Sequence, residues 1–438
     1  MYRREFMESL FLASFFGLPT VGANLHTRAI YYWNLQSPPE GLSRAVEIIN
    51  KLNPDFIWYA HWVVGFPMPK DLKTAEELAK NIDPSNARRF IEWCRKEFYT
   101  LEDVKKQVEA VEGRIYCPCI LGYPNFNRIL NFDPITFEQF SKDEIESMLL
   151  NFGKWDIKNP KTGKPFTTEE TQEYFREKDM PERGAIPDFS NPKVIEYYVR
   201  KVKALKMVGV QAVWYDMFFQ LPMNLAKQFG LDHPMIKNLY DGCCDIIEGA
   251  KSLGLTVGTW SLCLNFPYRR VPDVDFVNAS PTVSEVRSIS VNYPRWNKIV
   301  ETIKEKSPNA WLLIMFDFAN KDDLPLPVFS QELTPRQQCE FLMKLHDLSV
   351  KINEQGIRSC VAYPIHGPGL GANPKKLAWD KYNVYDALAP EFNTFDTIYS
   401  LLAKPTPTPK ETPTIHPIIS LLILATIAAI MRRKGKKI

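Results

Sequence analysis

The sequence predicts an α/β fold, a single (β/α)8 TIM barrel followed by a C-terminal transmembrane helix. Three observations support the barrel. Eight short apolar segments that suit buried strands recur along the chain, segments with helical spacing alternate with them, and one strand candidate ends on a carboxylate, Asp216. Strands that alternate with helices form parallel sheets, and eight such strands suggest a closed barrel. The chain has 438 residues, of which 45% are hydrophobic, and this suits a large globular core.

The predicted strands follow one another at regular intervals and are, in chain order, residues 28–34, 55–62, 114–121, 210–215, 255–260, 275–279, 310–317 and 356–363. Helical spacing between them predicts helices over residues 40–52, 86–98, 101–111, 192–208 and 246–253. The longest interruption is the polar segment 125–187, with helical turns expected near 142–150 and 169–177. Such an insertion either shapes a binding cleft or only elaborates the packing.

The segment from residue 185 to 219 is the most informative part of the chain. Asp188-Phe189-Ser190 supplies helix-capping side chains, Pro192 suits the first helical turn, and Gly209 ends the helix. A buried strand follows and ends on Asp216. Because the carboxyl ends of barrel strands face the active site, Asp216 is a catalytic candidate. A helix cap or a salt-bridge partner is the structural alternative for this side chain.

This block resembles a motif of retaining glycoside hydrolases with (β/α)8 barrels, above all the α-galactosidase-like and family 31 α-glucosidase-like enzymes. Their pattern is similar to D-F-[ST]-N-P, a helix, and then G-V-[DQ]-[AG]-x-W-x-D-M. The resemblance implies that Asp216 takes the place of the nucleophile on the fourth strand. The next residues, Met217-Phe218-Phe219, depart from the Asn-Glu that follows in family 31.

A glycosidase needs a second carboxyl group, about 5–5.5 Å away for retention or about 6.5–9.5 Å away for inversion. Asp317 is one candidate, because it ends a strongly apolar strand. Glu285, in the loop after the sixth strand, is the candidate that the α-galactosidase-like resemblance implies. The fifth strand ends on Trp260 and Ser261 without an acid. Strand-end residues that could bind sugar hydroxyls or stack on sugar rings are Trp33, Asn34, His61, Trp62, Tyr123, Trp260, Asn278, Tyr363 and His366.

No metal-binding, phosphate-binding or dinucleotide-binding motif is present in the sequence, so we expect neither a metal nor a cofactor. Asn278-Ala279-Ser280 has the N-glycosylation spacing, but we expect it to be unmodified if it lies in the cleft. The formal net charge is +3, and five positive charges fall in the last seven residues, so the remainder carries about −2. This argues against nucleic acid as a partner and favours a neutral or weakly polar substrate. We expect most of the eight cysteines to be buried structural residues.

Both ends of the chain have the composition of targeting segments. Residues 1–23 match a secretory signal with a small-residue cleavage site, and residues 24–400 would form the barrel domain. A Thr/Pro-rich stalk at 401–414, an apolar helix at 415–431 and a basic tail at 432–438 follow. This order resembles that of archaeal surface-anchored proteins.

These observations predict a single-pass cell-membrane protein whose extracellular barrel is a glycoside hydrolase acting on an oligo- or polysaccharide. The alternative is a non-catalytic carbohydrate-binding or surface-structural barrel, suggested by the altered residues after Asp216. A polysaccharide deacetylase or lyase is less favoured, because the sequence shows no Asp and His metal set.

Overall fold

The computed structural model describes residues 27–36, 41–63, 68–96, 98–123, 126–127, 131–176, 184–317, 324–368, 384–389 and 392–403. Eight parallel strands close into a barrel, because each pairs with the next and the last pairs with the first. They are β1 (Ala29–Tyr32), β2 (Phe56–Val63), β3 (Ile115–Leu121), β6 (Ala212–Asp216), β7 (Thr256–Trp260), β8 (Phe276–Ala279), β9 (Trp311–Ile314) and β10 (Ser359–Pro368). All eight overlap the predicted strands, so the barrel prediction is confirmed.

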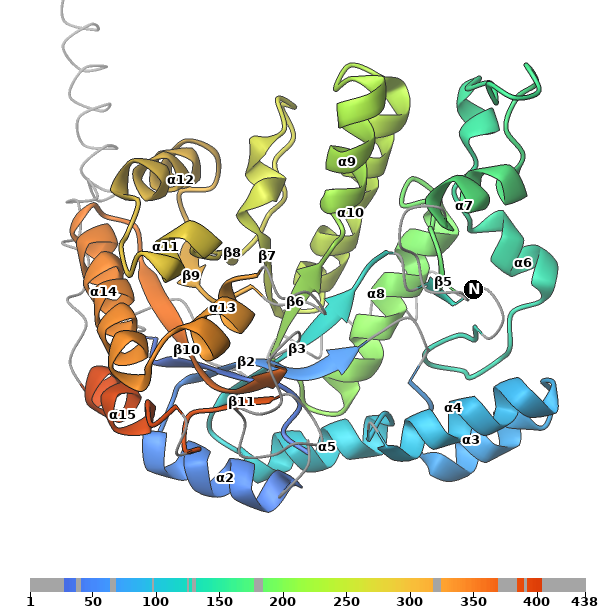
Figure 1. Cartoon of the computed structure of the whole chain (residues 1–438). Helices are drawn as coiled ribbons and strands as arrows, with labels where there is room; N and C mark the ends of the chain where they lie inside the picture. Colours follow the sequence, from blue (N-terminus) through green and yellow to red (C-terminus); the bar gives the residue numbers. More distant parts are fainter. Residues whose placement is uncertain are drawn as a thin grey trace, which may run out of the picture.

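Helices surround the strands (Figure 1). In chain order they are α2 (Gly41–Leu52), α3 (Leu72–Ala79), α4 (Pro84–Lys96), α5 (Leu101–Ala110), α8 (Pro192–Met207), α9 (Gln220–Phe229), α10 (Pro234–Ser252), α11 (Val283–Arg287), α12 (Tyr293–Lys306), α13 (Pro325–Glu332), α14 (Pro335–Glu354) and α15 (Phe395–Ala403). A 3-10 helix, η3 (Ser261–Asn265), directly follows β7. Each of the five predicted helices overlaps one of these.

The local signals around α8 act much as the sequence predicts, with one correction. Pro192 occupies the first turn, and Gly209 follows the helix with φ +95°. The N-cap is Asn191, whose side chain accepts a hydrogen bond of 2.9 Å from the Lys193 N–H. Asp188 instead accepts hydrogen bonds from Ser190, so it shapes the loop that leads into the helix.

Aromatic rings fill the barrel interior. At the amino ends of the strands, Phe56, Phe276 and Trp311 contact one another with ring centroids 4.8 to 5.6 Å apart. The neighbouring Gly258 leaves room for this layer, because a Cβ there would lie 2.1 Å from the Phe276 ring. Closer to the carboxyl ends, the Trp58 and Trp214 rings are 4.9 Å apart. The interior is therefore a packed core, and in barrels of this kind the active site lies at the carboxyl end.

The insertion between β3 and α8 carries a small antiparallel pair, β4 (Phe126–Asn127) and β5 (Gly184–Ala185), and three helices. These are α6 (Lys142–Ser147), α7 (Thr168–Arg176) and the 3-10 helix η2 (Phe152–Trp155). Both predicted helical turns are confirmed. Figure 1 places α6 and α7 beside α8, at one side of the barrel.

The C-terminal part of the barrel domain adds a ninth strand, β11 (Val384–Asp386), antiparallel to β10. Helix α15 follows, packs against α14 and reaches three residues into the predicted stalk. The predicted signal, most of the stalk, the apolar helix and the basic tail lie outside the described residues. Within the described residues, no helix combines the length and the apolar character needed to cross a membrane. Seven of the eight cysteines are buried and Cys339 is partly buried.

Candidate active site

Asp216 is the last residue of β6, so its carboxyl group lies at the carboxyl end of the barrel. The four preceding residues of the strand are buried, and Asp216 itself is partly exposed. Met217, which follows, has φ +62°, a left-handed conformation that is strained for a residue with a side chain. The chain thus turns sharply between β6 and α9, and such strain is often found at functional sites.

The Asp216 carboxyl group has polar neighbours but no cationic partner. Its Oδ1 accepts a hydrogen bond of 2.7 Å from the Trp260 indole N–H, and the Met217 backbone N–H also donates to it. Burial raises the pKa of Asp216 to about 6, although both hydrogen bonds lower it. In the described part of the chain, no lysine, arginine or histidine pairs with this carboxylate. Helix α9 has Phe219 as its N-cap and no side-chain cap. Asp216 is therefore neither a salt-bridge partner nor a helix cap.

Asp317 follows β9 by three residues and is partly exposed. Its backbone N–H donates a hydrogen bond of 2.9 Å to the Ser280 hydroxyl group, and its carbonyl accepts one from Leu326. These two bonds hold the backbone of Asp317 between the end of β8 and the start of α13.

A pair of buried tyrosines, Tyr31 and Tyr59, lies near the two aspartates. The charge of Asp216 contributes to the raised pKa of Tyr59, and the charge of Asp317 contributes to that of Tyr31, in each case after the larger effect of burial. The two tyrosine rings lie 5.7 Å apart. Each aspartate thus lies near enough to one tyrosine of this pair for its charge to act on that tyrosine.

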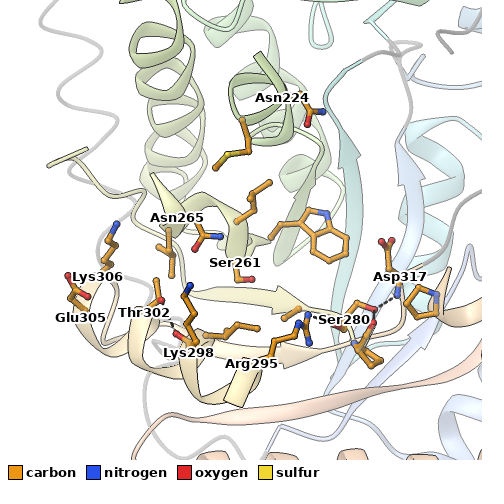
Figure 2. A pocket seen from close by; sticks show the side chains of 18 of the residues that line it. Asn224, Ser261, Asn265, Ser280, Arg295, Lys298, Thr302, Glu305, Lys306 and Asp317 are labelled. Atoms are coloured by element: carbon orange, nitrogen blue, oxygen red, sulfur yellow. Dashed lines mark hydrogen bonds between the residues drawn. The ribbon is translucent and has the colours of Figure 1, made fainter. Parts of the chain in front are cut away.

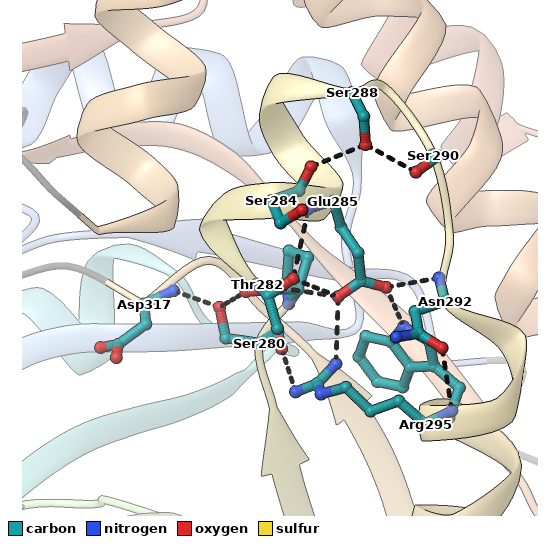
Figure 3. Close-up of polar contacts among 11 residues, drawn as sticks. Ser280, Thr282, Ser284, Glu285, Ser288, Ser290, Asn292, Arg295 and Asp317 are labelled. Carbon is teal, nitrogen blue, oxygen red and sulfur yellow. Dashed lines mark hydrogen bonds and ion pairs between the residues drawn. The ribbon is translucent and has the colours of Figure 1, made fainter.

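Glu285 has a structural role, which argues against its predicted role as a proton donor. Its Oε2 accepts hydrogen bonds from the N–H and hydroxyl groups of Thr282, forming the capping box of α11. Its Oε1 accepts from the Asn292 N–H at 2.7 Å and the Trp296 indole at 2.8 Å. Arg295 pairs with it at 3.3 Å (Figure 3). Because both oxygens of this buried carboxylate are occupied, Glu285 is not retained as a catalytic candidate.

A pocket of about 1050 Å³ opens beside Asp317 and Trp260. Its lining comes from α9, η3, α12, the ends of β7 and β8 and the segment after β9, and no described residue of the insertion lines it. In Figure 2, Asn224 lies on one side of the pocket, and Lys298 and Arg295 lie on the opposite side. Trp260 borders this pocket and also donates to Asp216, so the pocket adjoins the candidate carboxyl groups.

Four of the predicted sugar-binding aromatic residues remain candidates. Trp62 is 37% exposed, and the Trp33 ring lies 6.5 Å from it. The Tyr123 hydroxyl accepts a hydrogen bond of 2.9 Å from the Asn224 amide; burial raises its pKa, and the charge of Asp216 adds a smaller effect in the same direction. Trp260 lines the pocket. These rings present faces or edges on which a sugar could stack.

Three other predicted residues are buried in the structure, and burial argues against their predicted role in binding substrate. Asn278 is fully buried and accepts a hydrogen bond of 2.6 Å from Trp214, which also places it out of reach of glycosylation. His61 is buried and stacks on Tyr99, and burial lowers its pKa to about 3, so that it is neutral. Asn34 is buried at a left-handed turn with φ +46°.

Two candidates on β10 are also buried, and burial argues against their predicted role in the same way. The Tyr363 hydroxyl is 2.8 Å from Nδ1 of His346 on α14, so Tyr363 faces the outer helices. His366 stacks on Tyr32, and burial lowers its pKa to about 3. Among the described residues, no cluster of His, Cys, Asp and Glu side chains could hold a metal ion.

No model of a protein family and no curated protein matches this chain. The resemblance of residues 185–219 to the α-galactosidase-like and family 31 enzymes therefore stays a prediction.

Three solved structures with similarity to the chain have low sequence identity to it. A chitobiase from Flavobacterium johnsoniae is 11% identical, with 73% of this chain and 43% of that chain covered and a TM-score of 0.38. A trehalose-6-phosphate hydrolase from Bacillus licheniformis is 12% identical, with 85% and 72% covered and a TM-score of 0.42. An isomaltulose synthase from Protaminobacter rubrum is 13% identical, with 86% and 71% covered and a TM-score of 0.41. This chain thus spans less than half of the chitobiase, and likeness at this level says nothing about its activity. The barrel rests on the strand pairing of this chain itself.

Proposed function

We propose that the protein is a glycoside hydrolase whose two carboxyl groups are those of Asp216 and Asp317. The observation that carries this proposal is the Asp216 carboxyl group, which lies at a strand end without a cation to offset its burial. An unpaired carboxylate in such a place costs free energy and is characteristic of a reacting group. The adjacent pocket, the exposed Trp62 and the partly exposed Trp33 and Trp260 supply a surface for a sugar.

In the proposed reaction, Asp216 attacks the anomeric carbon while Asp317 gives its proton to the departing glycosidic oxygen. The bond from the anomeric carbon to that oxygen breaks, and a glycosyl ester with Asp216 forms. Asp317 then removes a proton from water, the water oxygen attacks the same carbon, and the ester is released as a free carboxylate. The Trp260 N–H stabilises the ionised form of Asp216 that is needed for the first step.

The experiment is a screen of oligosaccharides and aryl glycosides for release of reducing sugar, followed by substitution of the three acids. Asp216→Ala should lose activity, and azide should restore turnover and form a glycosyl azide. Asp317→Ala should retain activity mainly on substrates with good leaving groups, which need no proton donor. Glu285→Gln is the matched control, expected to lower stability while it leaves the catalytic pattern unchanged. Azide rescue of Asp317→Ala instead of Asp216→Ala would reverse the assigned roles, and full activity of Asp216→Ala would refute the mechanism.

A non-catalytic carbohydrate-binding barrel is the second candidate, and the position of Trp260 favours it. The fifth barrel strand ends on Trp260, and its indole N–H donates a hydrogen bond to Asp216 Oδ1. A binding protein would keep its affinity for a glycan in Asp216→Asn and would turn over no substrate in the screen.

We further propose that the barrel is displayed outside the cell and anchored by residues 415–431. The proposal is supported by the composition of residues 1–23, 415–431 and 432–438. Protease treatment of intact cells should remove the barrel, and deletion of residues 415–438 should release it into the medium. Full protection of the barrel in intact cells would contradict this location.

A further inference from the structure

The wall of the pocket beside Asp317 is rich in positive charge. Lys227 on α9 and Lys298 and Lys306 on α12 line it, together with Arg295. The acidic lining residues are Glu305 and Asp317. Arg295 is paired with the buried Glu285, so three lysines face two acidic side chains in the lining, and one positive charge remains in excess. This excess stands out because the chain without its basic tail carries about −2.

Lys298 has the most available ammonium group of the three lysines for binding an anionic ligand. It is exposed, it points into the pocket in Figure 2, and its ammonium group has no hydrogen bond or ion pair in the described part of the chain. The other two lysines each have a single neutral partner. Lys227 donates to the Asn224 side chain at 3.2 Å, and Lys306 donates to the Phe266 carbonyl at 2.7 Å. Neither contact neutralises a charge.

The same wall is connected to the candidate catalytic carboxyl groups. Lys227 contacts Asn224, Asn224 donates to the Tyr123 hydroxyl, and the charge of Asp216 acts on Tyr123. On the other side, Trp260 lines the pocket and donates to Asp216. A ligand group bound among the lysines would therefore lie in the pocket that Asp317 and Trp260 also line.

We propose that this pocket binds a negatively charged sugar residue, so that the substrate is an acidic polysaccharide. This inference rests on the proposed function and replaces the neutral substrate that the overall charge suggests. The lysines would bind the carboxylate of a uronic acid or a sulfate ester, and Trp260 would stack on the ring. Amide and hydroxyl groups of the lining, from Asn224, Asn265 and Thr302, are suited to sugar hydroxyls.

The test measures binding to the purified full chain carrying Asp216→Asn, which needs no turnover. The ligands are oligouronates, each compared with its own neutral methyl ester, and sulfated oligosaccharides compared with their desulfated forms. At low salt at least one acidic ligand should bind about tenfold more tightly than its neutral counterpart, and added salt should reduce the difference. Preference for the uronate or for the sulfate identifies the anionic group.

Lysine substitutions in the same background give the second measurement. Lys298→Gln and Lys227→Gln should each reduce the preference for the acidic ligand about fivefold. Lys304→Gln is the matched control: it removes the same charge from α12 but lies outside the pocket lining and pairs with Glu301. The control should leave the preference unchanged.

The outcomes separate this inference from the proposed function. Equal binding of acidic and neutral ligands across the panel, or a preference unaffected by Lys298→Gln, overturns the inference even if the wild-type protein hydrolyses a neutral glycan. Lysine-dependent binding of an acidic ligand without any hydrolysis by the wild-type protein supports the acidic-sugar site and overturns the glycosidase assignment.

Discussion

The hydrogen bond between Trp260 and Asp216 can be removed while the aromatic ring is kept. Trp260→Phe deletes the indole N–H, which lies 2.7 Å from Asp216 Oδ1, and retains a flat apolar side chain at the pocket. This bond stabilises the carboxylate and lowers the pKa of Asp216, against the larger effect of burial. Its loss should therefore raise that pKa further above its present value of about 6.

The size of the shift follows from the strength of the bond. A hydrogen bond to an ionised group contributes about 1.5–3 kcal/mol, and one pKa unit corresponds to about 1.4 kcal/mol. We therefore expect the pKa of Asp216 to rise by about 1–2 units in Trp260→Phe.

The assay is the pH dependence of kcat/KM, which reports the ionisation of essential groups in the free enzyme. A nucleophile must be ionised, so activity should fall on the acidic side as Asp216 becomes protonated. In Trp260→Phe this acidic limb should move about 1–2 pH units to higher pH, and activity above the limb should be largely preserved.

The matched control is Trp296→Phe, which removes an indole N–H from Glu285 Oε1 at 2.8 Å. It should lower stability, because it leaves a buried acceptor less satisfied, and should leave the pH profile unchanged. An acidic limb that does not move in Trp260→Phe, or that moves equally in both variants, would refute the role given to Asp216.

Asp216→Asn should abolish hydrolysis. It should also stabilise the protein by about 2–3 kcal/mol at pH 7, because it removes the cost of ionising a partly buried carboxyl group with a pKa of about 6. Thermal unfolding should show this gain disappear below about pH 3.5, where the carboxyl is protonated in both states; no gain at pH 7 would contradict it. Lys201→Met should stabilise by about 1–3 kcal/mol near pH 6, because burial lowers the pKa of Lys201 to about 7. That gain should shrink towards pH 11, where the Lys201 side chain is largely neutral in both the folded and the unfolded chain. A gain independent of pH would show that the burial of the lysine charge is not its cause. Gly258→Ala should destabilise by about 1–3 kcal/mol, because its Cβ would overlap the buried Phe276 ring; an unchanged melting temperature would show that the barrel interior can adjust.

The eight barrel strands could be predicted because each is an apolar run between polar or glycine-containing segments. The helix from Pro192 could be predicted for the same kind of reason, since Pro192 and Gly209 mark its limits locally. These signals need no knowledge of distant residues.

The direction of individual side chains could not be predicted with equal success. Strand β2 carries an irregularity between Trp58 and Trp62, and Tyr59 has φ +65°, so the two-residue alternation of inward and outward side chains breaks there. His61 lies within this irregular stretch and is buried against Tyr99.

The structural role of Glu285 could have been predicted from the sequence. Thr282 and Glu285 have the Thr-x-x-Glu spacing of a capping box. This spacing predicts a structural role for Glu285, although an acid that follows a barrel strand can also be catalytic. The three pocket lysines offered no such signal. Lys227 is separated by some seventy residues from Lys298, and only the barrel brings α9 and α12 to the same pocket.

The two features that surround the end of β6 are both unfavourable to folding. A partly buried carboxyl group whose pKa is raised to about 6 costs about 3 kcal/mol at neutral pH, and a left-handed Met217 costs about 1–3 kcal/mol. Together they are comparable with a good part of the total stability of a typical protein, about 5–15 kcal/mol. An asparagine would avoid the first cost while it kept the shape and the bond from Trp260 largely intact. A purely structural role gives no reason to have aspartate at this position, whereas attack on an anomeric carbon requires the charge.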